Sequence, residues 1–323
     1  MQNFDDIRTL LKSDIQHTDE VLIERLSSNV ALINQMSSYI IGAGGKRLRP
    51  LLLLLCARAT GYEGNHHHLM AVVIELIHTA TLLHDDIVDE SSTRRGQDTA
   101  NEVWGNAASV LVGDFLYSRA FEMMVEPDSM RIMQILSKVT NSIAEGEVLQ
   151  LLNCQNAQLT EVEYFEVIER KTACLFQAAT QIGAILSDTD ETQELALRDY
   201  GLHLGSAFQI IDDVLDYESD AKTMGKEVGD DLAEGKTTLP MIYALENTSG
   251  KDHALLISSI ENADNSNIDQ VIEILSSVNA FDYTRQKAQE ASDLAKKSLV
   301  TLPESDYKNA LTLLCDLSLQ RKS

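Results

Sequence analysis

The sequence predicts an all-α protein formed by a single domain over residues 1–323. Only 4 prolines and 16 glycines occur among the 323 residues, and aromatic residues make up 5% of the chain. These fractions are low for a β-rich protein and suit long helices with short joints. Apolar side chains also recur every three or four residues, which is typical of amphipathic helices. Because no Pro- or Ser-rich linker divides the chain, we expect one domain of about ten or more helices.

Clusters of glycine, proline and aspartate mark the joints between the expected helices. These joints lie at residues 42–45, 61–64, 126–128, 187–190 and 225–235. The segments between them are about 20–30 residues long, which exceeds a typical globular helix. Near the N-terminus, Leu22, Leu26, Val30 and Ile33 form one apolar stripe and predict one amphipathic helix through these positions.

Two segments are apolar on nearly every face and are expected to be buried helices. Within residues 71–83 the only charged residue is Glu75, and residues 207–211 open a second segment of this kind. A helix that is apolar all round belongs in a protein core. Each of the two segments runs into a cluster of aspartates, so the sequence predicts carboxylates at the ends of central helices.

Acidic residues dominate the charge of the chain. The 26 Lys and Arg residues stand against 50 Asp and Glu residues, which gives a formal net charge of −24. This balance argues against a nucleic-acid partner, which requires a basic face. The longest apolar run, residues 51–57, is far shorter than the roughly 20 residues of a membrane span, and the N-terminus lacks a secretory signal. We therefore expect a cytoplasmic protein without a membrane span.

Four cysteines and three adjacent histidines have more ordinary explanations than metal binding. The cysteines are far apart in the chain and are expected to be inert core thiols; they are Cys56, Cys154, Cys174 and Cys315. The histidines are His66, His67 and His68, directly after a Gly-rich joint. We expect them to lie in a solvated turn.

The two aspartate clusters carry the strongest functional signal. Both have the pattern D-D-x-x-D, and together they comprise Asp85, Asp86, Asp89, Asp212, Asp213 and Asp216. The first and last residue of each cluster share a helix face, where like charges repel. Hard divalent cations relieve this repulsion, and Mg²⁺ typically binds one or two carboxylates while it bridges to substrate phosphates. The sequence therefore predicts a catalytic Mg²⁺ site for a phosphorylated substrate, with a solvated acidic surface as the alternative.

Basic and polar residues gather beside the aspartates although the chain has few cations. Lys46 and Arg49 lie in a Gly-rich turn before an apolar helix, whose N-terminus favours anions. His78 lies two helical turns before Asp85 on the same face, where a core histidine is the alternative. The other candidates are Arg94, Arg95, Lys171, Thr172, Gln209, Lys226 and Lys236. Their concentration near the acids predicts an anionic substrate.

Taken together, these motifs resemble the trans-polyprenyl diphosphate synthases. The resemblance rests on GGKRLRP, LLHDDIVDESSTRRG, ERKTA, FQIIDDVLDY, GKEVGDD and GKTTLP in this order. It covers nearly the whole chain, and GNAASVLVGDF and AEGEVLQL are similar to the bacterial octaprenyl synthases that make the ubiquinone side chain. The resemblance implies a helical bundle around a central cavity, usually homodimeric. It also implies condensation of isopentenyl diphosphate onto an allylic diphosphate such as farnesyl diphosphate.

The resemblance also implies a role for each matching residue. Asp85 and Asp89 would bind two Mg²⁺ ions and Asp212 a third, with the other three aspartates in support. The isopentenyl diphosphate would be bound by Lys46, Arg49, His78 and Arg95. The allylic diphosphate would be held by Arg94, Lys171, Thr172, Gln209, Lys226 and Lys236. The C-terminal Arg321-Lys322-Ser323 departs from relatives that end in a second arginine, which leaves its role open.

Product length is expected to depend on the helix that leads to the first acid cluster. Ala80 and Thr81, one turn before Asp85, are small, whereas short-chain members of the family carry a bulky aromatic residue there. Ile77 follows on the next turn, and Met123 and Met124 are the expected floor of an apolar tunnel, unless they only fill core gaps. A long product is therefore favoured over a C15–C20 product, and C40 rests on the resemblance.

Three other classes of protein share part of this pattern. A class I terpene cyclase also ionises diphosphates at an acidic motif, but it needs no second diphosphate site such as Lys46, Arg49 and His78 suggest. A non-catalytic subunit of a heteromeric synthase commonly loses acids from one cluster, whereas both are intact here. An acidic helical scaffold explains the fewest of the motifs. Turnover by the purified chain alone separates these classes.

Overall fold

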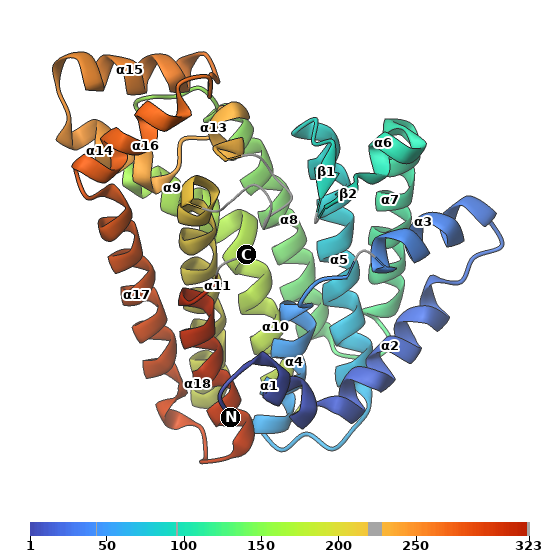
Figure 1. Ribbon diagram of the computed structural model, residues 1–323. Coiled ribbons are helices and arrows are strands. Elements are labelled where there is room, and N and C mark those ends of the chain that lie inside the picture. Colours follow the sequence, from blue (N-terminus) through green and yellow to red (C-terminus); the bar gives the residue numbers. More distant parts are fainter. Residues whose placement is uncertain (43, 95, 219–227, 322–323) are drawn as a thin grey trace.

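The expected all-α architecture is confirmed by the computed structural model, which is helical almost throughout (Figure 1). The structure describes residues 1–42, 44–94, 96–218 and 228–321. The predicted binding residues Arg95 and Lys226, and the C-terminal Lys322 and Ser323, lie outside these ranges. None of the described helices combines the length and the apolar character that crossing a membrane requires.

The N-terminal half contains the first acid-bearing helix and the elements around it. Its elements are α1 (Phe4–Leu10), α2 (Lys12–Leu26), α3 (Ala31–Gly42), α4 (Leu48–Ala59), α5 (His66–Val88), β1 (Thr93–Arg94), β2 (Gln97–Asp98), α6 (Ala100–Trp104), α7 (Asn106–Met123) and α8 (Met130–Leu152). The strands β1 and β2 form a small antiparallel hairpin directly after α5. The joints expected at residues 42–45, 61–64 and 126–128 all separate helices.

The C-terminal half contributes the second acid-bearing helix and completes the bundle. Its elements are α9 (Glu161–Ile168), the π-helical turn η1 (Glu169–Ala173), α10 (Cys174–Ile185), α11 (Glu191–Glu218), α13 (Asp230–Ala233), α14 (Leu239–Asn247), α15 (Gly250–Glu261), α16 (Ile268–Ser277), α17 (Ala280–Ser298), the 3₁₀ turn η2 (Leu299–Thr301) and α18 (Asp306–Leu319). Helix α11 packs against α10 on one side and α17 on the other. The long helices thus run roughly side by side (Figure 1).

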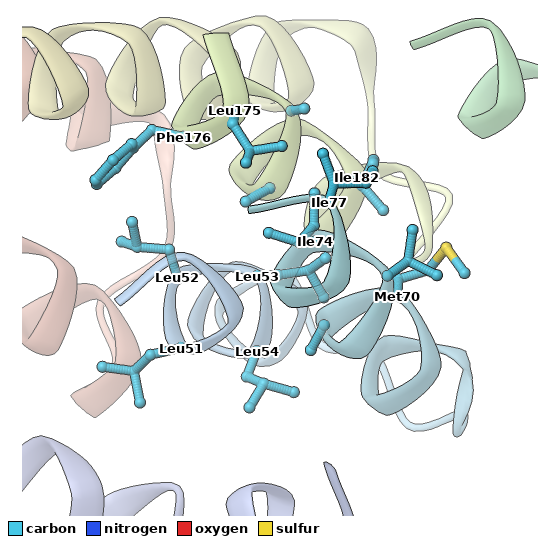
Figure 2. Close-up of a cluster of buried hydrophobic side chains, with 14 of the residues drawn as sticks. Leu51, Leu52, Leu53, Leu54, Met70, Ile74, Ile77, Leu175, Phe176 and Ile182 are labelled. Carbon is cyan, nitrogen blue, oxygen red and sulfur yellow. The ribbon is translucent and has the colours of Figure 1, made fainter. Parts of the chain in front are cut away.

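The core forms where α4, α5 and α10 meet (Figure 2). All five leucines from Leu51 to Leu55 are at most 4% exposed, because α4 is covered on every side. Ile74 and Ile77 of α5 point toward Ile182 of α10 in this cluster (Figure 2). Burial of such side chains stabilises a fold by about 1.5–3 kcal/mol each. The apolar segment before the first acid cluster is therefore a central helix, as predicted.

The single N-terminal helix predicted through residues 22–33 is wrong, because the chain breaks between α2 and α3. Helix α2 ends at Leu26, α3 begins at Ala31, and Val30 is 54% exposed. The Ser28 hydroxyl accepts a hydrogen bond from the Val30 N–H, and the Asn34 side chain bonds both backbone groups of Ser28. Ser and Asn side chains that bond the nearby backbone compete with helical hydrogen bonds.

The solvated turn predicted for the three histidines is also wrong, since two of them are buried in α5. His67 is 0% and His68 8% exposed. Their Nε2 atoms lie 3.0 and 2.9 Å from Oδ1 of Asp14 in α2. Arg58 of α4 donates to both oxygens of the same carboxylate, at 2.5 and 3.0 Å. Because a guanidinium already neutralises Asp14, we interpret the cluster as a hydrogen-bonded joint between three helices and not as a metal site.

This joint predicts a loss of stability in mild acid. Burial lowers the pKa of His67, and hydrogen bonds from the histidines and Arg58 hold the pKa of Asp14 well below its usual range, although burial opposes this. The unfolded chain binds a proton at His67 below about pH 6.5, whereas the folded chain binds it only at a lower pH, so stability falls as the pH drops through this range. The free energy of unfolding, measured by urea denaturation at pH 7, 6 and 5, is expected to fall in that order.

The matched control is His67→Gln, which keeps a side-chain donor but cannot titrate. Its free energy of unfolding is expected to fall less between pH 7 and pH 5 than that of the wild type. Equal pH dependence in the two proteins would contradict a role for His67. Asp14→Asn is expected to cost about 2–3 kcal/mol at pH 7, because it leaves Arg58 without its partner.

Candidate active site

The first acid cluster occupies the last turn of α5. The side chains of Asp85 and Asp89 are 16% and 19% exposed, whereas that of Asp86 is only 5% exposed. The β1–β2 hairpin follows, and it places Arg94 with its guanidinium 2.7 Å from Oδ1 of Asp86. The middle aspartate is thus buried and paired with Arg94, and the first and last are somewhat more exposed.

The second cluster, near the end of α11, has a similar division of roles. The Asp212 side chain is 43% exposed, whereas Asp213 is 3% exposed. The Tyr164 hydroxyl donates to Oδ2 of Asp213 at 2.5 Å, and the Gln209 amide donates to Oδ1 at 2.8 Å. Asp216 is 9% exposed and accepts from the Asp231 N–H at 3.3 Å. In both clusters the middle residue is buried and satisfied.

Two lysines reach the first cluster from other parts of the chain. Lys236, in the loop before α14, has its Nζ 2.8 Å from Oδ2 of Asp89 and also contacts Glu234. Lys171 has its Nζ 2.5 Å from Glu147, 2.7 Å from Gln150 and 3.8 Å from Asp85. The lysines therefore connect the end of α5 with α8 and with the segment after α11.

Lys171 and Thr172 lie in the π-helical turn η1, which packs closely against α8 and α11. A Cβ atom at Gly146 would stand 2.7 Å from the Lys171 nitrogen, and one at Gly205 would stand 2.7 Å from the Ala173 Cα. Only glycine allows this approach at both positions. The hydroxyl of Thr172 donates to Gln209 of α11 at 2.9 Å. Single π-helical turns are frequent at functional sites, and here the turn points the lysine toward the acids.

The electrostatics of this region favour added positive charge. Burial raises the pKa of Asp85, and the charge of Asp89 adds to this against the opposing effect of Lys171. Burial, followed by the charge of Asp85, raises the pKa of Glu147 to about 7. Burial alone would lower the pKa of Lys236, but the carboxylates around it raise this pKa above the ordinary value. Carboxylates crowded in a poorly hydrated space are stabilised by cations.

A cavity of about 120 Å³ lies beside this group, between α8, α9, η1, α11 and the segment before α14. Five of the predicted residues line it, namely Lys171, Thr172, Gln209, Asp213 and Lys236. Residues of the predicted allylic diphosphate site that are far apart in the sequence thus share one space. The structure brings Arg94 to Asp86, at the neighbouring helix end.

The predicted isopentenyl diphosphate residues form a second basic group at the N-terminus of α4. Nη1 of Arg49 lies 3.0 Å from Nε2 of His78, which must accept because a guanidinium only donates. The Arg49 guanidinium also stacks 4.5 Å over the Phe176 ring. Burial lowers the pKa of Arg49 to about 10, and burial followed by the charge of Arg321 lowers that of Lys46.

Arg321 belongs to this basic group, although its role was open in the sequence. Its Nη1 lies 3.1 Å from Oδ1 of Asp212, and its guanidinium stacks 4.0 Å over the ring of Phe208. The C-terminal arginine therefore lies between the second acid cluster and the basic group at the start of α4. A charge at this place affects both groups.

The predicted product-length residues are largely buried. Ala80, Ile77 and Met123 are 0% exposed, Met124 is 1% exposed, and Thr81 is half-buried, with its hydroxyl bonded to the His78 carbonyl. Met123 is the last residue of α7, which packs along α5, and Met124 caps this helix. The assignment of these residues to a tunnel remains a prediction.

Sequence reasoning missed Glu147, Gln150, Tyr164 and Glu234. Glu147 and Gln150 belong to AEGEVLQL, which was matched as a motif without a role for its residues. A glutamate and a glutamine three residues apart at the end of an amphipathic helix share a face, and this spacing was the available signal. Tyr164 carries no such signal, because its partner Asp213 lies 49 residues away. Glu234 lies two residues before its partner Lys236, and the sequence gives no sign that this lysine also reaches Asp89.

Comparison with known proteins accounts for the whole chain. The polyprenyl synthetase family model matches residues 30–278. Octaprenyl diphosphate synthase of Escherichia coli is 46% identical over 320 residues, which is 99% of each chain. A nonaprenyl diphosphate synthase of Rhodobacter capsulatus is also 46% identical, over 98% of this chain and 97% of its own. A short-chain isoprenyl diphosphate synthase of Methanothermobacter thermautotrophicus is 38% identical over 98% of this chain and 99% of its own.

A solved polyprenyl synthase of Caulobacter crescentus, described as complexed with calcium and isoprenyl diphosphate, superimposes with a TM-score of 0.96. It is 41% identical and covers 100% of this chain and 99% of its own. The resemblance and the enzyme class inferred from the sequence are therefore confirmed: the chain belongs to the polyprenyl synthetase family and is a trans-prenyltransferase.

Proposed function

We propose that the chain condenses isopentenyl diphosphate onto farnesyl diphosphate and makes all-trans octaprenyl (C40) diphosphate for a quinone side chain. The observation that carries the proposal is that Lys171 and Lys236, which pair with the first D-D-x-x-D cluster, line one cavity with Asp213 of the second. A separate basic group lies at the start of α4. The E. coli relative supports the C40 length. Free thiols at all four cysteines fit a cytoplasmic enzyme. Residues 1–323 form one domain in this proposal.

The donor set of the acid clusters fits Mg²⁺. Mg²⁺ takes oxygen ligands and keeps several waters, and the more exposed carboxylates are those of Asp85, Asp89 and Asp212. We assign two ions to Asp85 and Asp89 and a third to Asp212. Asp86, Asp213 and Asp216 already bond Arg94, Tyr164, Gln209 or the Asp231 backbone, so they orient the helix ends. Bound Mg²⁺ supplies Lewis-acid stabilisation of diphosphate charge.

The cations of the protein bind the allylic diphosphate and stabilise its departure. Lys171, Lys236 and Arg94 are held beside the acids, so their charges face the leaving group as the C–O bond breaks and negative charge develops on it. Preorganised charges of this kind stabilise a transition state without reorganisation. Thr172 and Gln209 hold the same face of the site through their mutual hydrogen bond.

The second basic group positions isopentenyl diphosphate for attack on the allylic cation. Arg49, Lys46 and His78 bind its diphosphate, so the double bond faces the carbon that loses its leaving group. A new C–C bond forms, and a proton is lost from the adduct to restore a double bond. We assign this proton to the departing diphosphate. Apolar walls exclude water from the cation.

We also propose a homodimer, with α7 and α8 at its interface. Large apolar side chains are exposed on both helices: Val110, Leu111, Phe121, Val148, Leu151 and Leu152. Exposed apolar groups in this number on two consecutive helices favour a protein partner. Sedimentation of Leu111→Glu compared with Val300→Glu, two positions that are 68% and 74% exposed, tests the assignment. Only the first variant is expected to weaken the dimer, and dissociation of neither or both would refute it.

The proposed reaction is tested by chromatography of the products from purified protein, farnesyl diphosphate, labelled isopentenyl diphosphate and Mg²⁺. A dominant C40 product that disappears with chelator and returns with added Mg²⁺ is the expected result. A C15–C20 product would keep the chemistry and refute the length. No product would favour a non-catalytic subunit, and a cyclic product from farnesyl diphosphate alone would favour a terpene cyclase.

A further inference from the structure

Glu75 is a charged residue without an assigned role in the apolar segment of α5, residues 71–83. It lies in the middle of α5 with its side chain 18% exposed, between fully buried neighbours at Ile74 and Leu76. Placing a carboxylate in such a position costs free energy unless it is paired. The charge of Glu75 therefore requires a function in the folded protein, and its surroundings indicate which one.

Both arginines at the start of α4 interact with Glu75. Nε of Arg47 lies 3.8 Å from its Oε1. Burial lowers the pKa of Arg49, and the negative charge of Glu75 is the largest of the charges that oppose this effect. His78, the partner of Arg49 at 3.0 Å, lies three residues after Glu75 and so on the same face of α5. One face of α5, with Glu75 and His78, thus contacts the start of α4 through Arg47 and Arg49.

The backbone at this point adopts a conformation that needs such support. Arg47 caps α4 with φ 44° and ψ 49°, in the left-handed region that non-glycine residues rarely occupy. A second carboxylate, Asp19 of α2, lies 2.5 Å from Nη1 of Arg47. Residues in such conformations persist only where their surroundings hold them. Asp19 of α2 and Glu75 of α5 therefore both pair with Arg47. Its neighbours Lys46 and Arg49 belong to the proposed substrate site.

We infer that Glu75 is a positioning residue for isopentenyl diphosphate: through its ion pair with Arg47 it holds the start of α4, and with it Lys46 and Arg49, against the face of α5 that carries His78. This inference rests on the proposed assignment of that substrate to Lys46, Arg49 and His78. Glu75 itself does not bind the diphosphate, because like charges repel. Its effect on binding passes through the arginines.

The sign of one measurement separates positioning from a simple field effect. If Glu75 acted only through its charge, Glu75→Gln would strengthen binding of an anion and lower the KM for isopentenyl diphosphate. A positioning role predicts the opposite, a KM raised about tenfold, with kcat and the KM for farnesyl diphosphate changed less than about threefold. Glu75→Asp keeps the charge on a shorter side chain. Its KM for isopentenyl diphosphate is expected to lie between those of the wild type and Glu75→Gln.

Two further variants make the result decisive. Arg49→Ala must raise the same KM if the substrate assignment is correct, so an unchanged value there refutes the proposed site and not only the role of Glu75. Glu194→Gln removes another buried carboxylate, which pairs with Arg131 at 2.7 Å in the first turn of α11. It is expected to lower stability without changing either KM.

If Glu75→Gln does not fold, Asp19→Asn tests the same loop from its exposed side and is expected to raise the KM for isopentenyl diphosphate about threefold. An unchanged or lowered KM for isopentenyl diphosphate in Glu75→Gln would overturn the inference. If Glu75→Gln does not fold, the same result in Asp19→Asn would overturn it. Equal rises for both substrates would do the same, because they would indicate a general structural role.

Discussion

Replacing Asp85 or Asp212 by alanine is expected to lower kcat by about 10³-fold or more while the far-UV circular dichroism stays helical. Each variant removes one of the more exposed carboxylates, which we assign to Mg²⁺. Loss of one metal ligand removes positive charge from the diphosphate at the moment when its negative charge develops. Turnover of labelled isopentenyl diphosphate at saturating substrates measures the effect.

The fold should tolerate these changes, since neither carboxylate is required for packing. Burial and like charge already raise the pKa of Asp85, so its removal relieves a strain on α5. Glu304→Ala, at a side chain that is 83% exposed and pairs with Lys308, is the matched control and should retain full activity. Near-native turnover in Asp85→Ala or Asp212→Ala would refute the metal assignment.

The buried aspartates should respond differently, which makes the division of roles testable in one series. Asp213 accepts from Tyr164 and Gln209 and is 3% exposed. Asp213→Asn is therefore expected to lower the melting temperature together with the activity, because it leaves buried donors facing an amide. A variant of Asp213 that lost activity as completely as Asp85→Ala, at unchanged stability, would place Asp213 among the metal ligands.

Much of this site could be predicted because its signals are local in the sequence. An apolar helix that ends in D-D-x-x-D places the first and last carboxylates on one face through helical geometry alone, and α5 and α11 do this as expected. The all-α fold followed from composition and periodicity for the same reason. Local patterns determine which elements form and which residues share a face.

The misplaced histidines and the missed Tyr164 have partners that are far apart in the chain. His67 bonds Asp14 across 53 residues, and Tyr164 bonds Asp213 across 49. No periodicity indicates which face of one helix meets which face of another, so a histidine that completes a buried joint looked like a residue of a turn. The break at Ser28 is different, since it is local but depends on side chains that compete with the helix backbone.

Ala80→Tyr is expected to shift the main product from C40 to about C15–C20. Ala80 lies one turn before the acid cluster and is 0% exposed, and Ile77 below it belongs to the packed core of α4, α5 and α10 (Figure 2). If the growing chain passes along α5 as predicted, a phenol at position 80 would block its path. Chromatography of the dephosphorylated products gives the length distribution.

A graded series separates this steric block from general damage. Ala80→Ser should keep the long product, Ala80→Leu should shorten it partly, and Ala80→Tyr should shorten it most, because the length then follows side-chain volume. Overpacking a core costs about 1–3 kcal/mol, so Ala310→Leu, at a fully buried alanine of α18, controls for lost stability and should still make C40. If product length stayed unchanged across the series, the chain would not grow along α5, and Met123 and Met124 would be core residues and not the floor of a tunnel.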